Sequence, residues 1–317
     1  MHFDNLVQKI RLIDQDLADS MQRVETGWKT PDPEDAELTE LIAAVLLGCI
    51  RDDMFSIETM VTGFKAFAHD FFERQMDCIR SGAYLAKDYE VIRKEVYTND
   101  AYMATTYYPA LLLSYLASPN YRHILRSLRS VLLQWQKTSV GRIIDIASGH
   151  GLLLLYALNA LQTARGVSVD LSPVAAKFAA QLQVSTGWAD SRFECATRDL
   201  LVAESAEFEG EFDAAICCEL LEHIPNPAAF LQRIRKFLRP GGRLFISAAV
   251  RMESVDHLTF FAKISDVAEL IQQHGFAITR EMSVPFVTKR PSNEARWNRL
   301  LEDPAMAVTY IAECTAL

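Results

Sequence analysis

Long basic runs and long apolar runs are both missing from this 317-residue sequence, which carries a formal net charge of −9. No stretch interleaves Lys or Arg with aromatic residues, as nucleic-acid binders do. An acidic chain is also a poor partner for an anionic membrane surface. The longest apolar run, Leu41 to Ile50, is far shorter than the roughly 20 residues that span a bilayer. We therefore expect neither a nucleic acid nor a membrane as a partner.

Paired cysteine motifs are also missing. The six cysteines form no CxxC pair and have no partnering histidine motif. This spacing favours free thiols in a reducing compartment over a disulfide framework or a zinc site. The residues from Met1 to Asn5 lack the basic and then apolar pattern of a secretory signal. We expect a cytoplasmic protein without a metal site.

The first part of the chain, residues 1–137, contains helical periodicity and no strand-like alternation. Apolar residues spaced by three and four predict helices. The predicted ranges are 3–26, 35–49, 55–81 and 121–135. We interpret residues 1–137 as an all-helical lid that precedes a second domain of residues 138–317.

The predicted helix 55–81 places its aromatic residues mostly on one face. Phe64, Phe67, Phe71 and Phe72 belong to this stripe. We expect the stripe to pack in a core, and the alternative is that part of it walls an apolar pocket.

The segment 89–116 is rich in tyrosine and is interrupted by Pro109. Proline removes a backbone donor, so a kink or a helix break is expected there. Tyrosine combines an apolar ring with a polar tip, which suits the wall of a small-molecule site. The alternative is that these rings simply pack, with their hydroxyls in water.

After residue 138, short apolar runs alternate with amphipathic helices. The expected strands are 142–147, 166–170, 192–196, 212–218, 243–249, 276–283 and 308–314. This alternation predicts an α/β fold with a seven-stranded, mostly parallel, Rossmann-like sheet and an antiparallel last strand. In such sheets the ligand lies beyond the carboxyl ends of the strands, where the strand order reverses.

The turn after the first strand carries Gly149 and Gly151, and Asp170 ends the second strand. Glycines let the backbone approach a ligand closely. A carboxylate at the end of the second strand can accept hydrogen bonds from both ribose hydroxyls. These features alone would also suit NAD.

Three further features favour a different cofactor. The third glycine of the dinucleotide fingerprint is absent, since Leu152 follows Gly151. Asp145 lies inside the first strand, where a carboxylate can orient a loop that binds an amino-acid moiety. The fourth strand is followed by Glu219-Leu220-Leu221-Glu222-His223.

Together these motifs resemble the class I S-adenosylmethionine (SAM)-dependent methyltransferases, over roughly residues 138–317. The resemblance implies SAM as the cofactor and a first motif formed by Asp145, Ala147, Ser148, Gly149 and Gly151. It also implies Asp170 at the ribose, Leu171 beside the adenine, and Glu219 on the methionine side. The Arg239–Gly242 turn and the segment that begins at Asp256-His257 resemble later parts of the family pattern.

One departure concerns the adenine contact. Family members often place Gly-Asp after the third strand, whereas this chain has Ala196-Thr197-Arg198-Asp199-Leu200. Either Asp199, followed by Leu200, meets the adenine from a shifted position, or Thr197 takes its place.

Two histidines are candidate catalytic residues. His223 follows the fourth strand near the expected cofactor, and His257 lies in a loop after the fifth strand. A general base is required only if the nucleophile must lose a proton that solvent cannot take. The alternatives are a structural role for His223 and a surface or capping role for His257.

The resemblance identifies the helical region as a lid that determines substrate choice. The candidate substrate contacts are Tyr97, Tyr102, Tyr107 and Tyr108. We expect methyl transfer to a small molecule, in natural-product or specialised metabolism. The alternatives are SAM chemistry without methyl transfer, a NAD-dependent oxidoreductase, and a non-catalytic partner-binding module. A homodimer through the N-terminal helices is left open.

Overall fold

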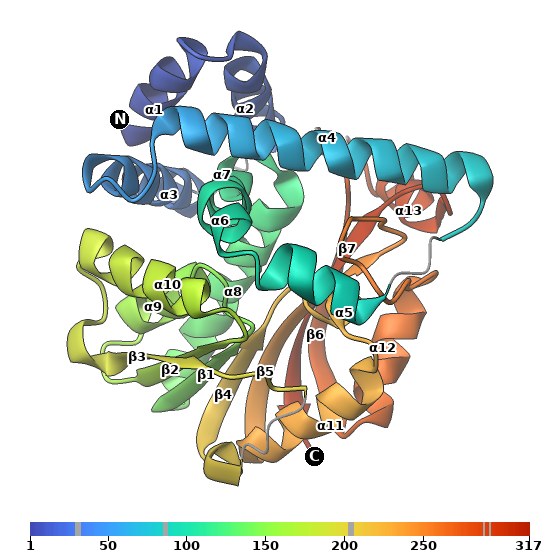
Figure 1. Ribbon diagram of the computed structural model, residues 1–317. Coiled ribbons are helices and arrows are strands. Elements are labelled where there is room, and N and C mark those ends of the chain that lie inside the picture. Colours follow the sequence, from blue (N-terminus) through green and yellow to red (C-terminus); the bar gives the residue numbers. More distant parts are fainter. Residues whose placement is uncertain (29–32, 85–87, 202–205, 288, 292) are drawn as a thin grey trace.

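The computed structural model describes residues 1–28, 33–84, 88–201, 206–287, 289–291 and 293–317. It has a helical N-terminal part and a C-terminal part built on one sheet (Figure 1). The N-terminal helices are α1 (His2–Arg11), α2 (Gln15–Gly27), α3 (Pro33–Arg51), α4 (Ile57–Ser81), α5 (Tyr89–Ile92), α6 (Asp100–Tyr102), α7 (Tyr108–Ala117) and α8 (Pro119–Lys137). Two π-helical turns, η1 (Arg93–Tyr97) and η2 (Met103–Tyr107), interrupt this series.

The C-terminal part alternates strands with helices. Its strands are β1 (Arg142–Ile146), β2 (Arg165–Asp170), β3 (Phe193–Thr197), β4 (Phe212–Cys217), β5 (Leu238–Val250), β6 (Phe276–Pro285) and β7 (Val308–Ala316). Its α-helices are α9 (Leu152–Ala160), α10 (Pro173–Thr186), α11 (Pro227–Phe237), α12 (Ile264–Gln273) and α13 (Glu294–Glu302), with short 3₁₀ turns η3 (Asp190–Arg192), η4 (Ala206–Phe208) and η5 (Leu221–His223).

The strand order is β3-β2-β1-β4-β5-β7-β6. All neighbours are parallel except β7, which is antiparallel to both β5 and β6. The predicted sheet, including its antiparallel last strand, is therefore confirmed. The order reverses between β1 and β4, so the crevice for a ligand lies at their carboxyl ends.

Alternation along β1 divides the core into two layers. Ile143 belongs to an apolar cluster that continues into α8, α9 and the N-terminal helices. Ile144 and Ile146 belong to a second cluster, with α11 and α12. Successive side chains of a strand point to opposite faces, so the sheet is covered on both sides. One of its two cores is continuous with the helical part. The division of the chain into two domains between residues 137 and 138 therefore stays a prediction.

The expected single helix over 3–26 is wrong. The chain forms α1 and α2 with a break between them, because Asp14 caps the second helix by accepting the N–H of Leu17 at 2.8 Å. Side-chain capping of this kind satisfies a donor that a helix start leaves free.

The aromatic stripe of α4 is only partly a core face. Met60 and Val61 in its first turns are buried, whereas Phe72 is 60% exposed and Met76 is 41% exposed. The expectation of a packed stripe is therefore wrong for the second half of α4. The described residues that line the cavity below include none from α4.

Two boundaries differ from the expected ones. Pro109 lies in the first turn of α7, directly after η2, so the predicted helix break is a change from π to α geometry. Strand β5 begins at Leu238 and includes the Arg239–Gly242 turn, where its pairing with β4 is irregular. Helix α13 was not predicted from the sequence.

Candidate cofactor and acceptor site

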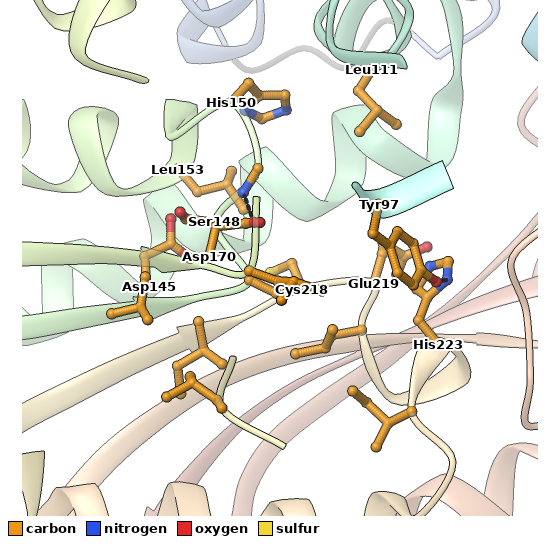
Figure 2. A pocket seen from close by; sticks show the side chains of 18 of the residues that line it. Tyr97, Leu111, Asp145, Ser148, His150, Leu153, Asp170, Cys218, Glu219 and His223 are labelled. Atoms are coloured by element: carbon orange, nitrogen blue, oxygen red, sulfur yellow. Dashed lines mark hydrogen bonds between the residues drawn. The ribbon is translucent and has the colours of Figure 1, made fainter. Parts of the chain in front are cut away.

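A cavity lies at the carboxyl ends of β1, β2 and β4, beneath the N-terminal helical segments. Figure 2 shows side chains from the strand ends, including Asp145, Asp170 and Glu219, together with Tyr97 and Leu111 from the helical part. One cavity wall thus contains residues from both halves of the chain.

The glycine-containing turn that follows β1 lines the cavity beside that strand. Ala147 and Gly149 adopt positive φ values of 51° and 53°. The Ser148 N–H donates to the carbonyl of Val169 at 3.2 Å, and its hydroxyl lies 2.5 Å from that of Ser168. These contacts attach the turn to β2. The predicted Ala147, Ser148 and Gly149 all line the cavity.

Asp170 joins the turn to the start of α10. Its Oδ2 accepts the N–H of Gly149 at 2.8 Å, and its Oδ1 accepts the N–H of Ser172 at 2.8 Å. Burial raises the pKa of Asp170, and the N–H donors of Ser172 and Gly149 oppose that rise. The carboxylate therefore has a fixed orientation at the end of β2, and both it and Leu171 line the cavity.

Asp145 is a buried carboxyl in the cavity wall, only 3% exposed. Burial raises its pKa to about 8, although the N–H of Leu154 acts in the opposite direction. Its Oδ2 has no hydrogen-bond partner among the described residues. An unpaired buried oxygen that faces a cavity is a ready acceptor for a ligand.

Gly151 differs in its position from the other residues of the predicted first motif. It is not among the described residues that line the cavity. Its φ is 75°, and an added Cβ would lie 2.6 Å from the Cβ of Ala179 on α10. Close packing of α9 and α10 therefore requires glycine here, and a cofactor contact by Gly151 stays a prediction.

The loop after β3 contributes one more carboxyl group to the cavity wall. Asp199 and Leu200 line the cavity, whereas Thr197 is not among the described lining residues. Asp199 accepts the N–H of Leu201 at 2.9 Å and lies 3.5 Å from the Arg93 guanidinium of η1. The ion pair joins this loop to the helical part.

Glu219 follows β4 with a φ of 49°, which is unusual for a residue other than glycine. The hydroxyl of Ser247 donates to its Oε1 at 2.7 Å. Burial raises the pKa of Glu219 to about 7, and the Ser247 hydroxyl lowers it. A strained backbone that is held by its neighbours is characteristic of functional sites. Glu219 lines the cavity as predicted.

Three of the four predicted tyrosines line the cavity: Tyr97, Tyr107 and Tyr108. Tyr97 ends η1 and Tyr107 ends η2, so each π-helical turn places a tyrosine at the site. Isolated π turns are frequent at functional sites. Tyr102 is not among the described lining residues, although its ring is 6.1 Å from that of Tyr107.

His223 lines the cavity, whereas His257 is not among the described lining residues. Their rings meet edge to face, with centroids 4.8 Å apart. His223 Nδ1 lies 3.0 Å from the backbone carbonyl of Asp256 and 3.1 Å from the hydroxyl of Tyr97. Their proposed catalytic roles stay predictions.

Asp256 connects these groups. Its carboxylate accepts the hydroxyl of Tyr107 at 3.2 Å and that of Ser254 at 3.1 Å, and it lies 3.5 Å from His223 Nδ1. Although desolvation acts to raise it, the pKa of Asp256 is lowered overall by His223, His257 and the Ser254 hydroxyl. The sequence motif at Asp256-His257 indicated this region but not the connecting role of Asp256.

Sequence reasoning missed much of the apolar wall. The additional lining residues from the helical part are Tyr89, Met103, Leu111, Tyr115, Tyr121 and Ile124. Tyr89 and Tyr115 belonged to the tyrosine-rich segment, but nothing in their spacing distinguished them. Tyr121 and Ile124 lie on α8, whose periodicity predicted only a packed helix.

The donor set of the cavity suits SAM. Four carboxyl groups line it, those of Asp145, Asp170, Asp199 and Glu219. SAM has a positively charged sulfur and an ammonium group, which favour acidic neighbours, and it has ribose hydroxyls and an adenine amino group, which donate hydrogen bonds. The fold and site thus define a nucleotide-cofactor enzyme of the Rossmann-like class.

A family model described as a methyltransferase domain matches residues 119–281, just over half of the sequence. The chain belongs to this methyltransferase family. The predicted family, enzyme class and methyl-donor cofactor are therefore confirmed, and the NAD alternative is disfavoured.

Two curated relatives are named ubiquinone biosynthesis O-methyltransferase. The protein from Xylella fastidiosa (strain 9a5c) is 41% identical over 114 residues, which cover 36% of this chain and 44% of the relative. The protein from Xanthomonas euvesicatoria pv. vesicatoria (strain 85-10) is 34% identical over 134 residues, covering 40% and 52%. The chain thus spans about half the length of the curated relatives it matches.

Solved structures with a similar fold include the N-methyltransferase NodS from Bradyrhizobium japonicum WM9 in complex with S-adenosylhomocysteine (SAH). The similarity has a TM-score of 0.43 at 15% identity, covering 72% of this chain and 97% of that one. The [4+2]-cyclase SpnF gives a TM-score of 0.47 at 17% identity, covering 61% and 80%. Among the described residues, no helix is long and apolar enough to cross a membrane.

Proposed function

We propose that this chain transfers the methyl group of SAM to a hydroxyl oxygen of a small, largely apolar acceptor. The observation that carries the proposal is the continuity of one cavity. Carboxyl groups from the strand ends line part of it, and aromatic and aliphatic side chains of the helical part line the rest. Such a cavity suits a cationic cofactor and an apolar acceptor side by side.

The acidic part would hold the cofactor. Asp170 would accept the ribose hydroxyls. Asp199 lines the cavity and Thr197 is not among its described lining residues, which supports Asp199 as the residue that would meet the adenine amino group. Asp145 and Glu219 would face the amino-acid and sulfur end. SAM, when bound, supplies a methyl group on a positively charged sulfur, so its leaving group needs no further activation. The transfer would form the C–O bond, leave neutral SAH and release the hydroxyl proton to a base or to solvent.

The apolar part would hold the acceptor. Met103, Leu111 and Ile124 offer an apolar surface, and Tyr97 and His223 are polar groups in the same wall. Desolvation raises the pKa of Tyr97 well above its ordinary value, so its hydroxyl remains a neutral hydrogen-bond donor. The task of these residues is to exclude water and to position the acceptor oxygen, which can supply most of the rate enhancement.

Oxygen is the proposed acceptor atom because the two relatives described above are named O-methyltransferases. The match covers only part of either chain, so phenolic precursors of a quinone are one acceptor class among several to be tried. The setting in specialised metabolism, the cytoplasmic location and a homodimer through the N-terminal helices remain parts of the proposal.

Cofactor binding is tested first, by isothermal titration of the full chain with SAM, SAH and NAD. The variant Asp170→Asn should weaken SAM binding by about a hundredfold, because it weakens the acceptor that orients the glycine turn and meets the ribose. Asp213→Asn is the matched control: Asp213 also accepts two backbone N–H groups, from Gly141 and Arg142, both at 2.9 Å. Asp213 is not among the described lining residues of the cavity, so its variant should retain the wild-type affinity.

Methyl transfer is tested with SAM labelled in its methyl group and a panel of phenols, aliphatic alcohols and amines. We expect label in hydroxyl-bearing compounds. Binding of NAD without SAM would contradict the cofactor assignment, and SAM binding with label only in amines would contradict the choice of oxygen.

A further inference from the structure

Three candidate metal-binding side chains meet behind the acceptor part of the cavity. Glu222 and His223 lie in η5, and His257 lies in the loop after β5. Each offers one ligand atom, and these atoms lie within 4.8 Å of one another. Ligand atoms bound tetrahedrally to one Zn²⁺ at about 2.1 Å lie about 3.4 Å apart, so an ion would have to draw the most distant pair together by up to about 1.4 Å.

Both imidazoles are oriented by backbone carbonyls. His223 Nδ1 is 3.0 Å from the carbonyl of Asp256, and His257 Nδ1 is 3.0 Å from the carbonyl of Met252. A neutral imidazole that donates from Nδ1 carries its lone pair on Nε2. Metal-bound histidines commonly donate their other ring N–H in this way. His223 Nε2 lies 4.0 Å from Glu222 Oε1, so it faces the third candidate ligand.

Glu222 supplies a second, independent observation. The residue is 1% exposed, and neither Oε1 nor Oε2 has a hydrogen-bond partner among the described residues. A buried carboxylate without donors or a cation is costly. Burial and the neighbouring Glu219 raise the pKa of this carboxyl well above its ordinary value, and the backbone N–H groups of Glu222 and Ala249 only oppose that rise. Since neither N–H makes a hydrogen bond of ordinary geometry with it, both oxygens can take a cation beside His223.

Asp256 orients one of the candidate ligands, His223, from the side away from the proposed ion. Its carboxylate lies 3.5 Å from His223 Nδ1 and is itself held by Tyr107 and Ser254. A carboxylate behind a ligating histidine fixes the ring and raises its basicity.

We propose that Glu222, His223 and His257 bind one divalent first-row transition ion of the Zn²⁺ or Fe²⁺ class. Two imidazoles and one carboxylate, without a thiolate, are the ligands that these ions accept. Magnesium and calcium prefer sites built from oxygen atoms alone. This inference departs from the sequence-based expectation, which predicted no metal site.

The site also bears on the acceptor. Three protein ligands leave at least one coordination position for an oxygen from outside the protein. His223 is the ligand that also lines the cavity, so an acceptor hydroxyl is the group that this position would take. This part of the inference depends on the proposed function.

The test is metal binding by the full chain after treatment with a chelator, in the absence of SAM and acceptor. Titration with Zn²⁺ in competition with a chromogenic chelator should show one tight equivalent. Co²⁺ should give the visible absorption bands of an ion bound by nitrogen and oxygen. The variants Glu222→Gln, His223→Gln and His257→Gln should each weaken the binding at least tenfold.

Matched controls use exposed residues of the same types, Glu269→Gln and His69→Gln. These two control variants should leave the affinity for Zn²⁺ unchanged. Circular dichroism and thermal denaturation establish that each variant is folded, and the three ligand variants allow the test to proceed if one of them does not fold. The absence of a stoichiometric Zn²⁺ equivalent, or equal losses in ligand variants and controls, overturns the inference.

The outcome is distinguishable from a failure of the proposed function. Stoichiometric metal binding by a chain that does not bind SAM would contradict the function and leave the metal site standing. Undiminished methyl transfer by a chain that binds no metal would contradict the metal site and leave the proposed function standing.

Discussion

The phenol oxygen of Tyr97 lies 3.1 Å from Nδ1 of His223, although 126 residues separate them in the sequence. The same hydroxyl donates to the backbone carbonyl of Asp256, also at 3.1 Å. Tyr97 is the last residue of a π-helical turn, and His223 ends the motif that follows β4. The helical part is thereby attached to the C-terminal part at the wall of the cavity that Tyr97 and His223 line.

The variant Tyr97→Phe should loosen this attachment without changing the ring. Loss of a neutral hydrogen bond costs about 1 kcal/mol, which is about fivefold in an equilibrium. We expect KM for the acceptor to rise by about that factor and the affinity for SAM to stay within about twofold. Amide hydrogen exchange in residues 88–107 should become faster.

Tyr102→Phe is the control on the same segment, because Tyr102 is not among the described residues that line the cavity. It should change neither KM nor exchange. A Tyr97→Phe protein with a normal acceptor KM but a strongly weakened SAM affinity would mean that Tyr97 serves the cofactor instead.

Gly151→Ala should be strongly destabilising. The residue has a φ of 75°, and the added methyl group would lie 2.6 Å from the Cβ of Ala179. A left-handed non-glycine residue costs about 1–2 kcal/mol, and overpacking adds about 1–3 kcal/mol. Urea denaturation without SAM should show the free energy of unfolding reduced by the sum of these costs.

Gly187→Ala separates the two costs. Gly187 caps the C-terminal end of α10 with a φ of 66°, and no atom lies within 4 Å of its added Cβ. This variant should lose only the backbone contribution. Equal losses at the two glycines would refute the proposed packing role of Gly151.

The sheet and the acidic part of the cavity could be predicted because both depend on local patterns. Buried strands appear as short apolar runs, and the carboxyl ends of parallel strands meet at one edge. Asp145, Asp170 and Glu219 each lie within or directly after such a strand. Their convergence on one cavity therefore follows from strand order.

The apolar part of the cavity could be predicted only in part, since Tyr97, Tyr107 and Tyr108 were expected there but Leu111 and Ile124 were not. Tyr97 and Tyr107 reach the cavity through π-helical turns. Such turns shift the side chains that follow relative to α-helical spacing. His257 and Glu222 approach each other because the backbone of Glu222 accepts N–H groups from Leu258 at 2.7 Å and Thr259 at 2.9 Å. Such contacts between distant loops leave no periodic signal. The break before α2 is a different case, since Asp14 is a recognisable cap that the continuous apolar stripe obscured.

SAM affinity should depend on pH through Asp145. Burial raises the pKa of this carboxyl to about 8, so it is mostly protonated at neutral pH before the cofactor binds. A cationic ligand favours the ionised form, and SAM binding should therefore release a proton. Affinity should rise as the pH increases towards 8, by at most about tenfold per pH unit, and should level off above that value.

The measurement is isothermal titration between about pH 6 and about pH 8.5, in two buffers with different ionisation enthalpies, which counts the released protons. Asp145→Asn cannot ionise, so its affinity should vary less with pH and fewer protons should be released; the part that remains belongs to Glu219, whose pKa burial raises to about 7. SAH lacks the positive charge on sulfur and should show a weaker dependence than SAM. A wild-type affinity for SAM that falls as the pH rises would show that the cofactor does not draw the ionised form of Asp145.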